Sequence, residues 1–138
     1  MNHYGIECAS KRAAVIGRSL VIGRPVAMML MHANATPTIC HTKTHDAPRI
    51  TREADIVVVA AGRMETIGAE YFCANQTVID VGIGWNEEKG RLCGDVKYDE
   101  VEPVVGAITP VPGGVGAVTT SVLMKHVAMA AGKRAKRS

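Results

Sequence analysis

Three short apolar runs that end in glycine constrain the fold of this chain more than any other feature. They occupy residues 13–17, 55–62 and 76–82, and a β-branched run at 36–40 and a short one at 107–110 resemble them. Runs that are apolar throughout, rather than alternating, are typical of strands buried on both faces of a parallel sheet. The sequence therefore predicts a sheet of mainly parallel strands.

Helical patterns separate these runs. Pro25 suits the first turn of a helix, and Val26, Met29, Leu30 and Ala33 follow it at helical spacing. Residues 46–53 and 68–72 are expected to form short surface helices or turns. The polar turn at 86–90, between Trp85 and the segment 92–96, is expected to form a hairpin or excursion. A last helix is expected at 116–131, with Val118, Val122, Leu123, Val127, Ala130 and Ala131 on one side.

Strands that alternate with helices predict an α/β fold: a doubly wound, mostly parallel, Rossmann-like sheet in three layers. Neither a linker nor a repeat divides the 138 residues, so we expect a single domain over residues 1–138. In such folds the ligand binds beyond the carboxyl ends of the strands, near the point where the strand order reverses. All three glycine-ended runs finish at that edge.

Charge and composition exclude several classes of function. The net charge is +3, and the last six residues contain Lys133, Arg134, Lys136 and Arg137, which we interpret as a solvated terminus. The rest of the chain is near neutral, which argues against a nucleic-acid partner. No apolar run approaches the ~20 residues that span a bilayer, so no membrane partner is expected.

The cysteines and histidines predict neither disulfides nor a metal site. Cys8, Cys40, Cys73 and Cys93 form no CxxC pair, and three of them lie in or beside apolar runs. Free thiols, mostly buried, are the expectation, together with a reducing, cytoplasmic location. The histidines are scattered without a second ligand nearby, so we expect no metal.

The turn after the first strand is a candidate phosphate site. Gly17 allows a tight turn, Gly23 lets the loop pack against the following helix, and the N–H groups at the helix start are expected to be unpaired. A pyrophosphate fits such a site. The spacing departs from G-x-G-x-x-G, however, so a glycine-rich turn that binds no ligand is an alternative at this point.

The end of the second strand bears on the choice of dinucleotide. NAD sites place a carboxylate about 20 residues after the first glycine to hold the ribose hydroxyls. Residues 40–44 read Cys-His-Thr-Lys-Thr and contain no carboxylate, while Arg18 extends from the facing loop. Hydroxyl and guanidinium groups bind phosphate oxygens, which favours NADP over NAD. A polar loop with incidental charge is the alternative interpretation.

No residue presents itself as a catalytic group. The chain has no nucleophile elbow, and none of its tyrosines is followed four residues later by lysine. Asp80 and Asp95 end or follow apolar runs, where capping or turn roles are expected. The sequence thus predicts dinucleotide binding without a catalytic residue.

Several motifs in a fixed order resemble one family. They are Gly17-Arg-Ser-x-x-x-Gly-Arg-Pro25, Cys40-His-Thr-Lys-Thr44, Ala54-Asp-Ile-Val57, Val78-Ile-Asp-Val-Gly-Ile83, Gly94-Asp-Val96 and Thr109-Pro-Val-Pro-Gly-Gly-Val-Gly116. Together they resemble the C-terminal dinucleotide-binding domain of bifunctional methylenetetrahydrofolate dehydrogenase/methenyltetrahydrofolate cyclohydrolase. The resemblance covers about residues 4–133.

The resemblance implies a function and a set of site residues. The whole enzyme would oxidise 5,10-methylene-tetrahydrofolate with NADP and hydrolyse the methenyl product to 10-formyl-tetrahydrofolate. Gly17, Arg18, Ser19, Thr42 and Ile83 match residues that line the cofactor, Thr119 lies near its nicotinamide end, and Pro112, Gly113, Gly114 and Val115 border the folate cleft. A homodimer is also implied.

The family's N-terminal folate domain, which carries its catalytic residues, has no counterpart here. The chain is therefore expected to be a fragment or a naturally short form. It is expected to bind the cofactor by itself, and the folate substrate only together with another domain. A nucleotide-sensing or regulatory Rossmann module without catalysis is the alternative function, and an orphan domain that binds nothing is a third.

Overall fold

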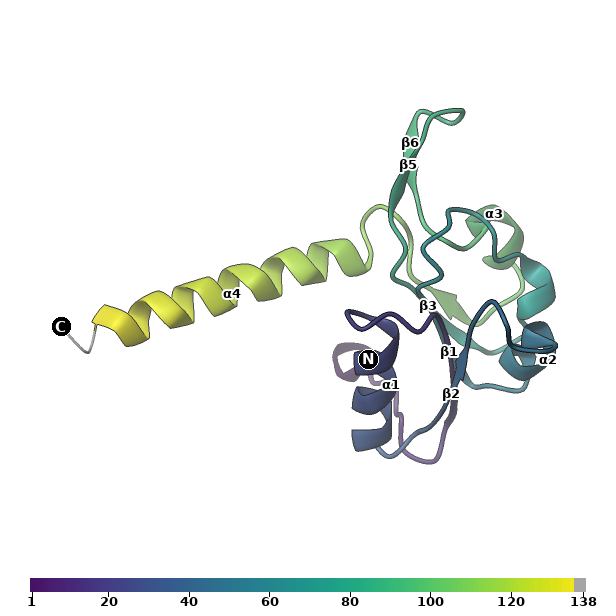
Figure 1. Cartoon of the computed structure of the whole chain (residues 1–138), viewed down its shortest axis with the longest axis horizontal. Coiled ribbons are helices and arrows are strands. Elements are labelled where there is room, and N and C mark those ends of the chain that lie inside the picture. The colour runs from purple at the N-terminus through teal and green to yellow at the C-terminus, as the bar shows by residue number, and fades with distance from the viewer. Residues whose placement is uncertain (136–138) are drawn as a thin grey trace.

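Five parallel strands form one sheet in the order β2–β1–β3–β4–β7. The computed structural model describes residues 1–135 (Figure 1). The strands are β1 (Arg12–Ile16), β2 (Thr36–Cys40), β3 (Ile56–Val59), β4 (Thr77–Asp80) and β7 (Ala107–Ile108). The order reverses between β1 and β3, which confirms the predicted α/β, Rossmann-like sheet.

Helices cover both faces of this sheet, and a two-stranded arm rises above it (Figure 1). The helices are η1 (Asn2–Tyr4), α1 (Gly23–His32), α2 (Ala47–Arg52), η2 (Ala69–Tyr71), α3 (Tyr98–Val101) and α4 (Val115–Ala135). The arm is an antiparallel hairpin of β5 (Gly84–Asn86) and β6 (Arg91–Cys93). It is the hairpin or excursion expected around the turn at 86–90.

Alternate residues of the central strands feed two separate cores. Ala14 and Ile16 of β1 pack with Val57 and Val59 of β3 on the side of α3 and η2. Their neighbours Ala13, Val15, Ile56 and Val58 pack with Ala27 and Leu30 of α1 on the other side. Both sets are buried, which is why β3 is apolar throughout and β1 is apolar after Arg12.

The face that α1 buries differs from the expected one. Leu30 is buried and Val26 is half-buried, as the spacing predicts, but Met29 is 69% exposed and Ala33 is exposed. The buried face instead contains the small residues Gly23 and Ala27. They bring α1 close to the loop after β1, which turns the larger methionines outward.

The last helix does not pack on the sheet. Figure 1 shows α4 leaving the domain after β7 and running away from it. The expectation of a single apolar side is wrong, because residues at 118, 122, 123, 124 and 127 point in several directions around the axis. Each of these apolar side chains is 44–66% exposed. None of the helices within residues 1–135 is long and apolar enough to span a membrane.

The thiols follow the sequence prediction. All four cysteines are free, with Cys8, Cys40 and Cys93 buried and Cys73 half-buried. Burial raises the pKa of the Cys40 thiol.

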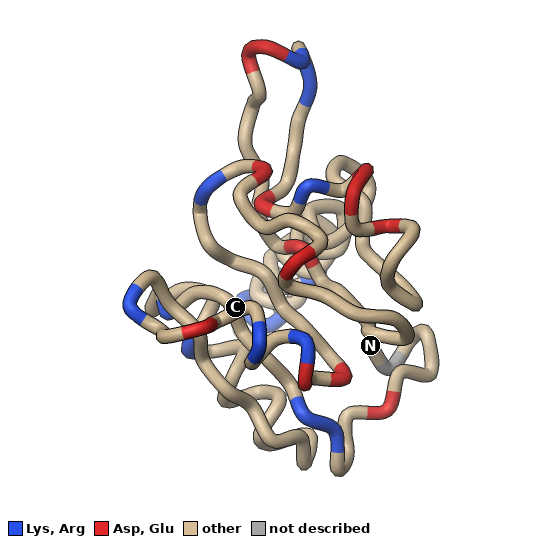
Figure 2. The backbone as a smooth tube through the Cα atoms, turned by 90° about the vertical axis from the view of Figure 1, so that its right-hand side faces the viewer, with Lys and Arg blue, Asp and Glu red and all other residues tan. Residues whose placement is uncertain are grey.

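Acidic and basic residues are interspersed along the backbone (Figure 2). Of the basic tail, Lys133 and Arg134 are exposed, whereas Lys136 and Arg137 lie outside the described residues.

Candidate functional site

The loops that leave the carboxyl ends of all five strands meet at one edge of the sheet. The N–H of Gly17, after β1, donates to the Cys40 carbonyl at 2.9 Å, and that of Ala60, after β3, donates to the Ile16 carbonyl at 2.7 Å. Thr109, after β7, likewise donates to Val78 of β4 at 3.1 Å. The predicted site residues Gly17, Arg18, Ser19, Thr42 and Ile83 therefore lie on loops of this one edge.

Two glycines set the shape of the first loop. A Cβ on Gly17, whose φ is +126°, would lie 2.2 Å from the Ala60 carbonyl oxygen. A Cβ on Gly23 would lie 2.2 Å from the Gly17 carbonyl oxygen. No other residue type permits backbone segments to approach so closely. The loop over residues 17–23 is thus pressed against both α1 and the loop after β3.

The start of α1 is not the open anion site that the sequence predicts. The hydroxyl oxygen of Ser19 accepts the N–H groups of Ile22 (3.0 Å) and Gly23 (3.3 Å), and the Ser19 carbonyl accepts that of Arg24 (3.1 Å). Pro25 has no N–H to offer. Because Ser19 lies four residues ahead of the helix and caps it, the first turn has no free donor left.

The unpaired N–H donors lie just before these residues, in the loop that precedes α1. Within the described residues, the backbone N–H groups of residues 18–21 have no acceptor. Arg18 is exposed, and its carbonyl is held by Nε of Arg24 at 3.2 Å. Successive unpaired backbone amides can form an anion-binding site. These donors are suited to a dinucleotide pyrophosphate, and a Cβ at Gly17 or Gly23 would collide with the backbone that holds this loop in place.

A tight turn follows β2. The N–H of His41 donates to the Thr44 hydroxyl (2.9 Å), and the N–H of Lys43 donates to Nδ1 of His41 (3.1 Å). These bonds occupy His41 and Thr44, while the side chains of Thr42 and Lys43 are exposed. The nearest following carboxylate, Asp46, caps α2 by accepting the N–H of Arg49. No carboxylate belongs to the turn itself.

Two buried carboxylates support the other half of the edge. Asp80, the last residue of β4, accepts N–H groups from Gly82 (2.9 Å), Asp95 (3.2 Å) and Val96 (3.0 Å). Asp95 accepts the N–H of Gly62 at 2.7 Å. Burial raises the pKa of Asp80, although its three backbone hydrogen bonds act in the opposite direction. Capping and turn roles were expected for both, but their depth of burial was not.

The loop after β7 borders a hollow of about 240 Å³ whose lining includes Asp80, Gly94, Pro110 and Val111. Gly113 has a φ of +95°, and a Cβ on Gly114 would lie 2.3 Å from the Pro110 carbonyl oxygen. The lining of the hollow ends at Val111, so the predicted residues Pro112, Gly113, Gly114 and Val115 follow it in the chain and lead into α4 without lining it. Thr119, in turn, donates its hydroxyl to the Val115 carbonyl of the same helix at 3.0 Å.

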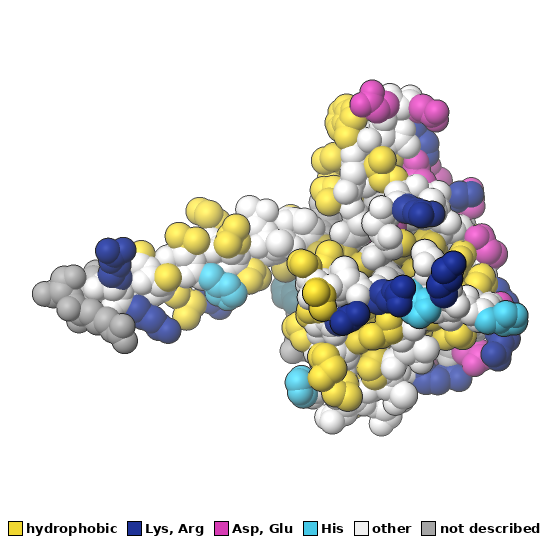
Figure 3. All heavy atoms as spheres, viewed as in Figure 1, with side chains coloured by type: hydrophobic (Ala, Val, Ile, Leu, Met, Phe, Trp, Pro, Cys, Tyr) yellow, Lys and Arg dark blue, Asp and Glu magenta, His cyan; other side chains and the backbone are white. Residues whose placement is uncertain are grey.

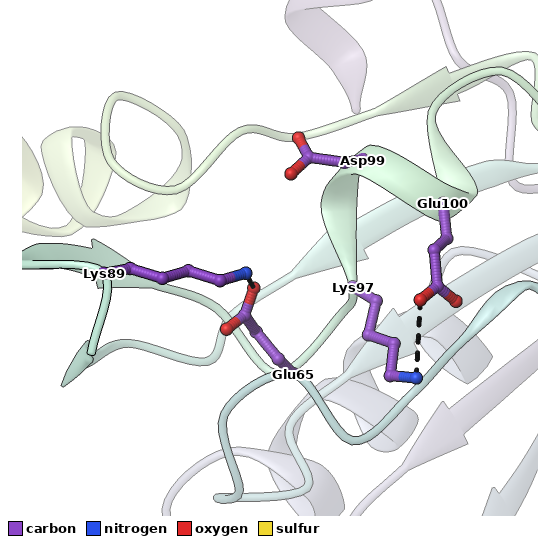
Figure 4. Close-up of a pocket in the computed structure, with 5 residues that line it drawn as sticks. All are labelled: Glu65, Lys89, Lys97, Asp99 and Glu100. Atoms are coloured by element: carbon purple, nitrogen blue, oxygen red, sulfur yellow. Dashed lines mark hydrogen bonds and ion pairs between the residues drawn. The ribbon is translucent and has the colours of Figure 1, made fainter. Parts of the chain in front are cut away.

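A second hollow, of about 280 Å³, is unsuited to a dinucleotide. Its lining is Glu65, Lys89, Lys97, Asp99 and Glu100 (Figure 4). Lys89 pairs with Glu65, and Lys97 pairs with Glu100 at 3.4 Å. The contact with Lys89 also lowers the pKa of Glu65. The Lys89–Glu65 pair links the β5–β6 arm to the loop after β3, whereas the Lys97–Glu100 pair is local to the start of α3. No group of three or more metal-ligating side chains occurs within residues 1–135.

The chain resembles known proteins over nearly its whole length. A family model described as tetrahydrofolate dehydrogenase/cyclohydrolase, NAD(P)-binding domain, matches residues 1–135. The bifunctional protein FolD of Carboxydothermus hydrogenoformans is 51% identical over 131 residues, which are 94% of this chain and 46% of that protein. FolD of Methanospirillum hungatei is 53% identical over 123 residues, 89% of this chain and 43% of that protein.

Solved structures agree with this similarity. The bifunctional FolD enzyme of Campylobacter jejuni superposes with a TM-score of 0.89 at 41% identity, over 96% of this chain and 47% of that one. The Trypanosoma brucei enzyme, solved with NADP cofactor and an inhibitor, gives a TM-score of 0.80 at 41% identity, over 90% and 44%. The chain thus spans less than half the length of the relatives it matches.

Proposed function

Since the chain belongs to the tetrahydrofolate dehydrogenase/cyclohydrolase family as its NAD(P)-binding domain, we propose that it holds NADP for the oxidation of 5,10-methylene-tetrahydrofolate. The nicotinamide of that cofactor, when bound, accepts the hydride. Hydrolysis of the methenyl product to 10-formyl-tetrahydrofolate would follow in the same whole enzyme. The folate would bind mainly to the part of the enzyme that this chain does not span.

One observation carries the proposal: the anion-binding loop between β1 and α1. The unpaired N–H groups of residues 18–21 supply donors for the pyrophosphate, and the contacts of Gly17 and Gly23 keep that loop in place. Ser19 caps α1, so its hydroxyl acts on the phosphates through the loop shape that it fixes. Ile83, which is 63% exposed, would offer an apolar surface to the cofactor, and Thr119 would lie near its nicotinamide end.

The phosphorylated dinucleotide is the preferred cofactor. A ribose 2′-phosphate needs cations and hydroxyls, and Arg18, Thr42 and Lys43 are all exposed at this edge. NAD would need a carboxylate to hold its ribose hydroxyls, and the turn after β2 has none. Figure 3 shows a row of Lys and Arg side chains across the face between α1 and the β5–β6 arm. This charge favours the extra phosphate.

The long helix supports the proposal of a second domain. Apolar side chains that are exposed together along a helix are typical of a surface that contacts another part of a larger structure. Exposed apolar side chains are visible along α4 up to its basic end (Figure 3). We infer that the remaining half of the enzyme covers α4, and that Pro112, Gly113, Gly114 and Val115 then border the folate. A homodimer and a cytoplasmic location, in keeping with the free thiols, belong to the same proposal.

A cofactor titration of the purified chain tests the proposal. NADP should bind more tightly than NAD, and Arg18→Ala should weaken NADP binding by ~1.5–3 kcal/mol, about tenfold or more, because a charge-assisted hydrogen bond is lost. NAD binding should change little. Lys11→Ala, an exposed cation in the loop that precedes β1 at the amino end of the sheet, is the matched control. Equal affinities for the two dinucleotides in the unchanged chain would contradict the cofactor choice.

A further inference from the structure

Two carboxylates are buried at the carboxyl edge of the sheet without a cation to neutralise them. Asp80 is 3% exposed and Asp95 is 2% exposed. Within residues 1–135, neither one forms a salt bridge. Taking a charged carboxylate out of water without such a partner is strongly unfavourable unless hydrogen bonds replace the lost hydration. Backbone N–H groups do so here.

The donors come from loops that are far apart in sequence. Asp80 holds the loop after β4 through Gly82, and it holds the segment after β6 through the N–H groups of Asp95 and Val96. Asp95 then holds the loop after β3 through Gly62. The chain of contacts from Gly82 to Asp80 to Asp95 to Gly62 therefore ties together the loops that follow β3 and β4.

Glycines make room for this arrangement. A Cβ on Gly94 would lie 2.0 Å from Oδ2 of Asp80, and a Cβ on Gly82 would lie 2.3 Å from Cγ of Asp95. Neither glycine has a positive φ, so neither is required for the conformation of the backbone. Both are required because a carboxylate occupies the space where a side chain would begin.

The loops after β3 and β4, which Asp80 and Asp95 hold, belong to one half of the proposed cofactor site. In a doubly wound sheet, one mononucleotide half of the cofactor lies on each side of the reversal point. The turn after β2, with Thr42 and Lys43, serves the adenosine half, so the loops after β3 and β4 face the nicotinamide half. Resting on the proposed function, we propose that Asp80 and Asp95 are positioning residues that fix the backbone bordering the nicotinamide half.

The two carboxylates differ in what they tolerate. The side chain of Asp95 accepts one N–H, through Oδ2, so an asparagine there can turn its carbonyl oxygen toward Gly62. Asp80 uses both of its oxygens as acceptors, Oδ1 toward Gly82 and Asp95 and Oδ2 toward Val96. An asparagine there would place an NH₂ group against an N–H donor. Asp95 is therefore the position at which positioning can be tested by conservative rescue.

The test compares two ligands by calorimetric titration of the full 138-residue chain. One ligand is NADP, and the other is adenosine 2′,5′-bisphosphate, which lacks the nicotinamide half. Asp95→Ala should weaken NADP binding about tenfold or more, while the affinity for the fragment stays within about twofold of the unchanged chain. Asp95→Asn should restore NADP binding. If Asp95→Ala does not fold, Asp95→Ser serves as the truncation.

Gln76→Ala is the matched control. Gln76 is also buried, at 2% exposure, but its amide holds Thr51 and Ala54 at the opposite, amino end of β4. This variant should lower the melting temperature, as Asp95→Ala does, without changing the ratio of the two affinities. Equal weakening of both ligands by Asp95→Ala, or failure of Asp95→Asn to rescue, would overturn the proposal. An unchanged chain that binds neither ligand would overturn the proposed function itself.

Discussion

Replacing Gly23 by alanine should disrupt both the fold and the anion-binding loop. The new Cβ would lie 2.2 Å from the Gly17 carbonyl oxygen, whereas ordinary contacts begin at 3.4 Å and real Cβ atoms almost never come within 3.0 Å. The carbonyl must therefore move by about 0.8 Å or more. The same peptide plane carries the N–H of Arg18, so this movement also turns the first of the free donors.

The expected magnitudes follow from this overlap. Overpacking of this kind costs about 1–3 kcal/mol, which for a chain of this size lowers the melting temperature by roughly 3–15 °C. A misdirected donor to a phosphate removes ~1.5–3 kcal/mol of binding, so NADP should bind about 10–150-fold more weakly. Thermal unfolding followed by circular dichroism measures the first effect, and calorimetric titration with NADP measures the second.

A glycine without close neighbours provides the control. A Cβ on Gly132 of α4 meets nothing within 4 Å, so Gly132→Ala should leave both quantities unchanged or raise stability slightly. If Gly23→Ala melts and binds NADP like the unchanged chain, the loop does not depend on the close approach of residues 17 and 23. The reasoning that places the phosphates there would then be refuted.

Three further predictions concern pH, catalysis and association. Because the pKa of Asp80 is raised on folding, mainly by burial, its contribution to stability is complete below its unfolded pKa and is lost as pH rises through its folded pKa. Asp95→Asn removes a neighbouring charge that also raises this pKa, so the loss should move to lower pH in urea titrations at a series of pH values. The chain alone should form no NADPH from NADP and 5,10-methylene-tetrahydrofolate by absorbance, because the proposal places folate binding mainly on the part of the enzyme that this chain does not span. A rate above the no-enzyme control that Ser19→Ala abolishes would contradict this. The exposed apolar residues of α4 should make the isolated chain self-associate, and Leu123→Glu should reduce this association in sedimentation experiments. An unchanged chain that is monomeric at high concentration would contradict this prediction.

The sheet and its edge could be predicted from the sequence because they depend on local patterns. Apolar runs such as 55–62 indicate burial on both faces, and Gly17 and Gly82, which end two of these runs, indicate close approach at the carboxyl ends. The turn after β2 could be identified from the sequence as a candidate cofactor-binding turn because residues 40–44 contain no carboxylate. These features depend on residue type at a few adjacent positions.

Other features depend on contacts that sequence spacing does not reveal. Ser19 caps α1 from four residues ahead of the helix, so the donors expected at the helix start lie instead at residues 18–21. The link between Asp95 and Gly62 joins positions 33 residues apart. The direction of α4 could not be predicted from the local sequence pattern either, because its apolar residues surround the helix axis and indicate no single buried face.

The two halves of the carboxyl edge differ in how much order they have before any ligand arrives. The N–H groups of Gly62, Gly82 and Val96 are already bonded to buried carboxylates, so they open only when the surrounding structure opens. Those of residues 18–21 are free to exchange with solvent. Binding therefore loses little conformational entropy at the loops after β3 and β4 and more at the loop after β1. The phosphate end of a dinucleotide would bear most of the ordering, and the opposite end would meet a surface already formed.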